Sequence, residues 1–177
     1  MAFLMFAARV HDLLKQKSDI QYKLSKISRK LRHLQEYAAI IGNGSVSIGD
    51  LLKCPGSMMG RAIGYLSFAN ASAMQYMNSN APMMTAMFQQ QNAGMMQQNP
   101  AMMQNMQNYI MNSLWVQGRE LVKQQEEKNL KVEEGKIAQE KESLTTQLQE
   151  ITEEIKAAKE ARDQGIKDLA PKYVANA

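Results

Sequence analysis

Methionines are the residues of this sequence whose type and spacing come closest to a chemical site. Three pairs stand three residues apart: Met74 and Met77, Met84 and Met87, and Met103 and Met106. On a helix this spacing puts two thioethers on one face, an arrangement that suits Cu(I). The same residues also fit adaptable filler between helices, or a malleable surface for apolar helices or lipid. Because no His or Cys lies within a Met cluster, we assign no metal and no cofactor.

Residue types that commonly act in catalysis lack partners at motif spacing. His11 and His33 stand alone in the N-terminal segment, and no Gly-rich phosphate loop occurs. Cys54 is the only cysteine, which excludes an internal disulfide and a multi-cysteine zinc site but leaves a cross-link between two chains open. The sequence therefore predicts that the protein is not an enzyme.

Residues 10–41 place apolar side chains at alternating steps of three and four, as coiled-coil helices do. Gly42 and Gly44 follow and favour a left-handed helix cap and a turn. We expect a helix over residues 3–41. Its apolar stripe, which we call the N-terminal seam, contains Leu13, Ile20, Leu24, Ile27, Leu31 and Leu34.

The C-terminal part of the chain carries the same alternation. Most of its other residues are Glu, Lys, Gln and Ala, which are strong helix formers. We expect a helix from about 118 to 169, ending before Pro171. Its apolar stripe, the C-terminal seam, contains Leu144, Leu148, Ile151 and Ile155.

Charge is distributed unevenly in a chain whose net charge is +4. Residues 1–42 carry eight Lys or Arg against three acids, whereas residues 118–177 carry eleven against thirteen. This complementarity favours pairing of the two segments over binding of anionic lipid or nucleic acid. The basic run KISRKLRHL, residues 26–34, also lacks interleaved aromatic residues, so we expect no nucleic-acid partner.

The centre of the chain is uncharged, since residues 62–118 contain no Asp, Glu, Lys or Arg. Disordered linkers are usually charged and poor in apolar residues, whereas this segment is rich in Met, Gln and Asn. We expect helices at 58–79, 84–92 and 101–117, broken near Pro82 and Pro100, with the last running into the C-terminal helix. Small residues that permit close helix contact stand one turn apart: Gly60 with Gly64, and Ala69 with Ala73.

These patterns predict an all-α protein, a long antiparallel coiled-coil helical hairpin with a short-helix central insert. Its parts are an N-terminal heptad helix at 1–42, an insert at 43–117 and a C-terminal heptad helix at 118–177, together one elongated domain. Two helices leave each seam half covered, so further copies of the chain would complete the burial. The residues that we expect to contact those copies are Met83, Met84, Met87, Phe88, Met95, Met96, Met102, Met103, Met106, Tyr109 and Trp115.

The opening FLMFAARVHDLLKQKSDIQYKL, residues 3–24, resembles the extracellular filament subunits of type III secretion systems and, more distantly, flagellin-type proteins. The likeness is carried by Leu4, Met5, Phe6 and Ala7, by Ser18 and Asp19, and by the plan of terminal helices around an uncharged centre. It implies self-assembly into a hollow helical tube after export without signal cleavage. The terminal motifs typical of flagellins are absent, and residues 119–168 are richer in Lys and Glu than a packed tube lumen favours.

The leading functional hypothesis is a structural subunit that self-assembles into a filament or tubular sheath. The partner would be the chain itself. One alternative is a module whose Met-rich insert enters a membrane or holds an apolar helix of a client. Another is a phage or virion structural component. We expect an extracellular location reached without a cleaved signal, or else a cytoplasmic one, because the N-terminus lacks a basic region and a small-residue cleavage site.

Overall fold

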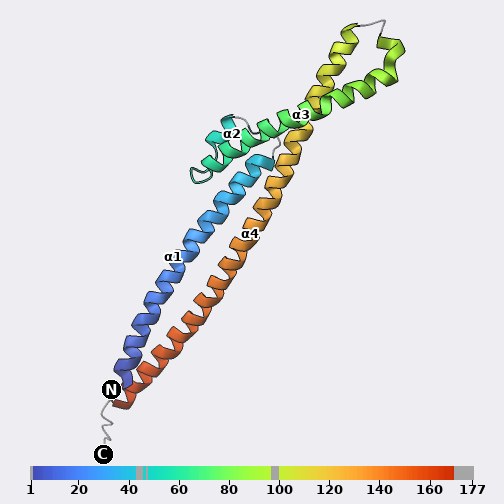
Figure 1. The fold of residues 1–177 in the computed structure, drawn as a ribbon. Helices are drawn as coiled ribbons and strands as arrows, with labels where there is room; N and C mark the ends of the chain where they lie inside the picture. The colour runs from blue at the N-terminus through green and yellow to red at the C-terminus, as the bar shows by residue number, and fades with distance from the viewer. Residues whose placement is uncertain (1, 43–45, 47, 97–99, 170–177) are drawn as a thin grey trace, which may run out of the picture. The chain divides into compact units, whose positions relative to one another are not determined.

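In the computed structural model, the described residues, 2–42, 46, 48–96 and 100–169, form four α-helices and no β-strand (Figure 1). The helices are α1 (Ala2–Gly42), α2 (Ile48–Leu52), α3 (Met59–Met96) and α4 (Pro100–Leu169). The prediction of an all-α protein built from long packed helices is therefore confirmed.

Helix α1 begins and ends within one residue of the range expected from the heptad pattern. Its last residue is Gly42, which has an ordinary helical conformation, so the left-handed cap expected at this position was wrong. Gly44 lies outside the described residues.

Helix α3 is continuous where a break was expected. Pro82 lies inside this helix of 38 residues, so the division into helices at 58–79 and 84–92 was wrong. Proline removes one backbone hydrogen bond, but the Ala, Met and Gln residues around it favour helix. Contacts with α4 on the same side also support the helix, because Ala81 and Pro82 line a groove shared with Gln107 and Met111 of α4.

Helix α4 is 70 residues long and includes Gly118 and Gly135 without interruption. The prediction that the helix at 101–117 runs into the C-terminal helix is confirmed, and α4 ends at Leu169 as expected.

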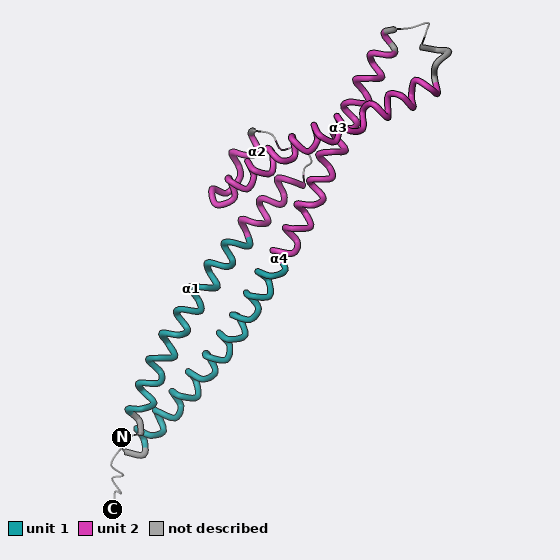
Figure 2. The backbone as a smooth tube through the Cα atoms, viewed as in Figure 1, with its two compact units in different colours: residues 1–31, 135–177 teal, residues 32–134 magenta. Residues whose placement is uncertain are grey.

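The chain forms two compact units, which Figure 2 shows in different colours. Unit 1 consists of residues 1–31 and 135–177, and unit 2 of residues 32–134. In unit 1, segments of α1 and α4 lie side by side, and the Arg9 guanidinium pairs with the Glu154 carboxylate at 2.9 Å. Its buried apolar side chains are Val10, Leu13, Ile20, Ile137 and Ile155.

Unit 2 contains the end of α1, all of α2 and α3, and the first half of α4. Its buried apolar side chains are Leu34, Tyr37, Ile41, Cys54, Ala62, Tyr65, Ala69, Ala73, Ile110, Leu114 and Leu130. Helices α3 and α4 lie close together at Gly118, where an added Cβ would lie 2.8 Å from the Ala73 Cα. The small pair Ala69 and Ala73 is fully buried, whereas Gly60 and Gly64 are exposed, with open space where a Cβ would be.

Candidate functional site

Four polar side chains from three helices of unit 2 form a network. Tyr37 of α1 donates a hydrogen bond to Glu126 Oε1 of α4 at 3.1 Å. Arg61 of α3 donates from Nε to the same oxygen at 2.7 Å, and from a terminal guanidinium nitrogen to Glu133 Oε2 at 2.6 Å. The guanidinium carbon also lies 5.4 Å from the centre of the Tyr37 ring, within the range of a cation–π interaction. The network ties three helices together around one partly buried cation.

The surroundings of Tyr37 and of Arg61 raise the pKa of each, so each keeps its usual protonation state near neutral pH. Burial, the Glu126 charge and the hydrogen bond to Glu126 raise the pKa of Tyr37, so the phenol stays neutral. Burial alone would lower the pKa of Arg61, but its hydrogen bonds to Glu133 and Glu126 raise the pKa above its ordinary value. These groups are suited to holding helices together rather than to exchanging protons near neutral pH.

The sequence analysis missed this network, although two signals for it exist. Arg61 is the last charged residue before the uncharged stretch, so it stands next to an apolar helix face. Tyr37 follows the seam residue Leu34 by three positions, which places both on one face of α1.

A second polar contact in unit 2 joins His33 and Ser57, whose Nδ1 and Oγ atoms lie 2.9 Å apart. A nucleophilic serine needs a base that is itself oriented by a third group. Within the described residues, no carboxylate hydrogen-bonds to His33, so the pair does not form a catalytic triad. The nearby Cys54 is buried, and burial followed by the charge of Glu36 raises its thiol pKa, which disfavours the reactive thiolate.

The predicted seam residues are all at least half-buried. Leu13, Ile20 and Ile155 in unit 1 and Leu34 in unit 2 are buried. The half-buried members, all in unit 1, are Leu24, Ile27, Leu31, Leu144, Leu148 and Ile151. Their pairing as the two sides of a single hairpin stays a prediction.

The predicted contact residues fall into two groups in unit 2. Met83, Met84, Met87 and Tyr109 are exposed, by 59%, 39%, 53% and 69%. Phe88, Met103, Met106 and Trp115 are half-buried. The side chains of Met95, Met96 and Met102 lie outside those that the structure describes. Their role as contacts between copies stays a prediction.

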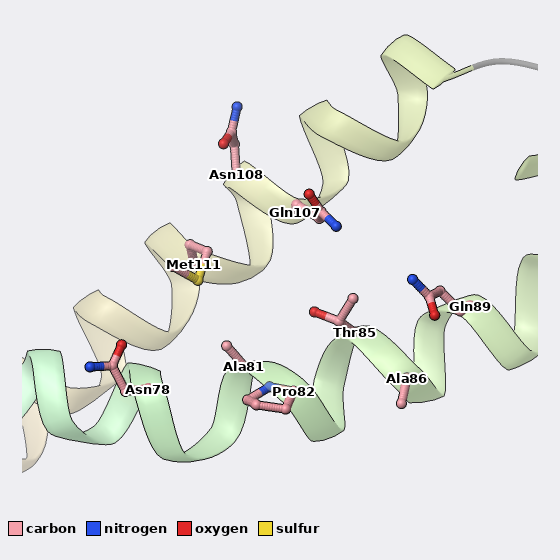
Figure 3. A pocket seen from close by; sticks show the side chains of 9 residues that line it. All are labelled: Asn78, Ala81, Pro82, Thr85, Ala86, Gln89, Gln107, Asn108 and Met111. Carbon is pink, nitrogen blue, oxygen red and sulfur yellow. The ribbon is translucent and has the colours of Figure 1, made fainter.

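A groove runs between α3 and α4 within the uncharged stretch (Figure 3). Its lining residues are Asn78, Ala81, Pro82, Thr85, Ala86, Gln89, Gln107, Asn108 and Met111. Thr85 and Gln89 of α3 and Gln107 of α4 point into the groove, as Figure 3 shows. The groove, which we call the amide groove, offers neutral hydrogen-bond donors and acceptors beside the exposed side chain of Met111.

The part of the chain that the structure describes contains neither a membrane-spanning helix nor a cluster of carboxylate, histidine and thiolate groups that could bind a metal ion. No helix there is long and apolar enough to cross a bilayer. Among the same residues, no group of three or more His, Cys, Asp or Glu side chains lies close enough to hold a metal ion.

No protein-family model, curated protein or solved structure matches the chain. The functional argument therefore depends on the residues of this chain and their contacts.

Proposed function

We propose that the chain is a structural subunit that self-assembles into a filament or tubular sheath. Its terminal helices form an antiparallel coiled-coil hairpin, and its uncharged segment contacts neighbouring copies. The pairing of Arg9 with Glu154, and the groove that Ile20 shares with Gln147 and Ile151, support the antiparallel hairpin.

The observation that carries the proposal is the exposed apolar surface within the uncharged segment. Met83, Met84 and Met87 lie on adjacent turns of α3, and Tyr109 lies on α4, all solvent-exposed in the isolated chain. Large exposed apolar patches commonly mark interaction surfaces. Amide side chains in the amide groove, on the side of α3 that faces α4, could hydrogen-bond to a neighbouring copy without the cost of burying a charge.

Negative-stain electron microscopy and sedimentation velocity of the purified protein test this proposal. We expect filaments or tubes that sediment much faster than a chain of 19.9 kDa. A charge within the half-buried part of the seam, Leu31→Asp, should abolish them, because burial of a leucine is worth about 1.5–3 kcal/mol. A wild-type protein that stays a single monomeric species at high concentration contradicts the proposal.

The role of the uncharged segment is tested by replacing Met83, Met84 and Met87 with Gln, which keeps length, neutrality and helix propensity. We expect the triple variant to remain helical and to assemble more weakly than the wild type. A matched control changes three exposed polar residues of the same helix, Asn70, Gln75 and Ser79, to Ala. Equal assembly by the two triple variants would contradict a specific role for the methionines.

The exposed methionines also favour a second candidate, a module that binds membrane or apolar helices through this segment. Flotation with neutral and anionic liposomes distinguishes the two candidates. If the Met-to-Gln variant loses liposome binding while its polymers stay intact, the segment is a membrane-binding element rather than an assembly contact.

A further inference from the structure

The outward face of α1 in unit 1 is mostly basic, with Asp12 and Asp19 as its acidic residues. Lys15, Tyr22, Lys26 and Arg29 each stand two positions after a seam residue, namely Leu13, Ile20, Leu24 and Ile27. Two positions correspond to about 200° around a helix, so this stripe faces away from the seam. All four side chains are exposed, Tyr22 by 68%. We call these residues the basic stripe.

The outward face of α4 in the same unit is mostly acidic, with Lys156 between Glu153 and Glu160 as a basic residue. Glu142 stands two positions before Leu144, Glu153 two positions after Ile151, and Glu160 continues the same face one heptad later. The three carboxylates are exposed, and within the described residues no ion pair engages any member of either stripe. We call these residues the acidic stripe. In unit 1, Arg9 of α1 forms an ion pair with Glu154 of α4.

The two stripes also match in spacing. Lys15 and Lys26 are eleven residues apart, as are Glu142 and Glu153, which corresponds to about 16 Å along each helix. Within one copy, Ile20 lies beside Gln147 and Ile151, so the two helix segments run past one another in a known register. A neighbouring copy in the same orientation and without axial shift would put Lys15 opposite Glu153 and Lys26 opposite Glu142. The same register brings Asp12 opposite Lys156, which is a further pair of opposite charges, and brings Asp19 opposite the neutral Gln149.

From this complementarity we infer that the basic stripe of one copy docks against the acidic stripe of the next copy. The inference rests on the proposed self-assembly and names one of its interfaces. Because the two surfaces differ, the contact is heterologous, and each copy keeps a free stripe of each sign. A heterologous contact repeats until it closes a ring or continues as an open filament, so this surface allows growth beyond a dimer.

Charge reversal tests the inference. Lys15→Glu with Lys26→Glu makes both stripes acidic, and Glu142→Lys with Glu153→Lys makes both basic. We expect either double variant alone to assemble only at a concentration at least about tenfold higher, because like charges then oppose one another. An equal mixture should assemble as the wild type does, since acidic and basic copies can alternate. Far-UV circular dichroism of each variant checks that the helices are retained.

The control changes the same net charge away from the stripes, with Lys53→Glu and Lys131→Glu, and should assemble as the wild type does. Sodium chloride at 1 M, where the screening length falls to about 3 Å, should weaken wild-type assembly. If both double variants assemble like the wild type, or if their mixture fails while each remains helical, the inference is overturned. The inference is also overturned if the Lys15→Glu, Lys26→Glu variant still assembles but no longer binds anionic vesicles. That result would assign the basic stripe to membrane binding. A wild type that never assembles refutes the proposed function itself.

Discussion

Units 1 and 2 cover their apolar side chains to different degrees. In unit 2, Leu34 and Tyr37 of α1 and Ala69 and Ala73 of α3 are each at most 1% exposed. In unit 1, two helix segments face one another, and six of its seam residues remain half-buried. Two helices can bury only the narrow strip where they touch, whereas a third helix closes the remaining side. Unit 2 therefore contains a closed core, although Met83, Met84, Met87 and Tyr109 stay exposed outside it, while unit 1 covers its seam only in part.

The units also place their charges differently. Unit 2 uses Arg61, Glu126 and Glu133 to join helices within the chain. Unit 1 has the Arg9–Glu154 and Arg162–Asp163 pairs, and its two outward stripes carry exposed charges of mostly opposite sign. The difference indicates that charged groups of unit 2 help to hold its helices together, whereas the charges of the two stripes in unit 1 remain exposed in the isolated chain.

The largest effect expected from this difference comes from shortening a leucine in each unit. Leu34→Ala should lower the free energy of unfolding by about 2–5 kcal/mol, because it leaves a cavity in a closed core. Leu24→Ala, in the half-buried seam, should cost about 1 kcal/mol in the monomer but weaken assembly more. Urea unfolding of dilute protein and sedimentation of concentrated protein measure the two effects. Equal losses of monomer stability would show that the units are equally well packed.

The next effect concerns the polar network of unit 2. Arg61→Met deprives Glu126 of its guanidinium partner and should lower the free energy of unfolding by about 1–3 kcal/mol. Arg32→Met is the matched control, because the ion pair of Arg32 with Glu36 is exposed and 3.7 Å long, and such pairs contribute about 0–1 kcal/mol. Urea unfolding of both variants gives the comparison. If the two losses are the same, the network does not hold the three helices together.

Substitution of two glycines of α4 should change the stability of the protein by smaller amounts and in opposite directions. Gly118→Ala pushes a methyl group against the Ala73 backbone and should destabilise the protein by about 1–3 kcal/mol. Gly135→Ala meets open space and should stabilise it by about 0.5–1 kcal/mol, since Ala is the better helix former. Thermal unfolding followed by circular dichroism should show midpoints that move in opposite directions. A stable Gly118→Ala variant would mean that α3 and α4 can separate at little cost.

The helices that follow from local hydrophobic periodicity could be predicted from the sequence, whereas the features that depend on tertiary contacts could not. The steps of three and four predicted α1 and the second half of α4, because local helix geometry determines which residues share a face. Pro82 was expected to end a helix, yet α3 continues through it while its neighbours contact α4. The meeting of Tyr37, Arg61 and Glu126 involves residues up to 89 positions apart, and no local pattern carries that information.

The smallest expected effect is a fall in the free energy of unfolding at high pH, which should involve unit 2 and not unit 1. The pKa of Tyr37 lies above its unfolded value of 10.0, so the neutral phenol is favoured by folding. Its stabilising contribution is complete below pH 10 and is lost as pH rises toward the folded pKa, by up to about 1.4 kcal/mol per pH unit. Tyr65, whose pKa is also raised by burial, should add to this loss of stability.

Tyr37→Phe should therefore flatten the decline of unfolding free energy between pH 10 and about 11.5. Tyr22→Phe, at an exposed ring of unit 1, is the control and should leave the decline unchanged; a Tyr37→Phe profile that follows the wild type would place the phenol outside the buried network.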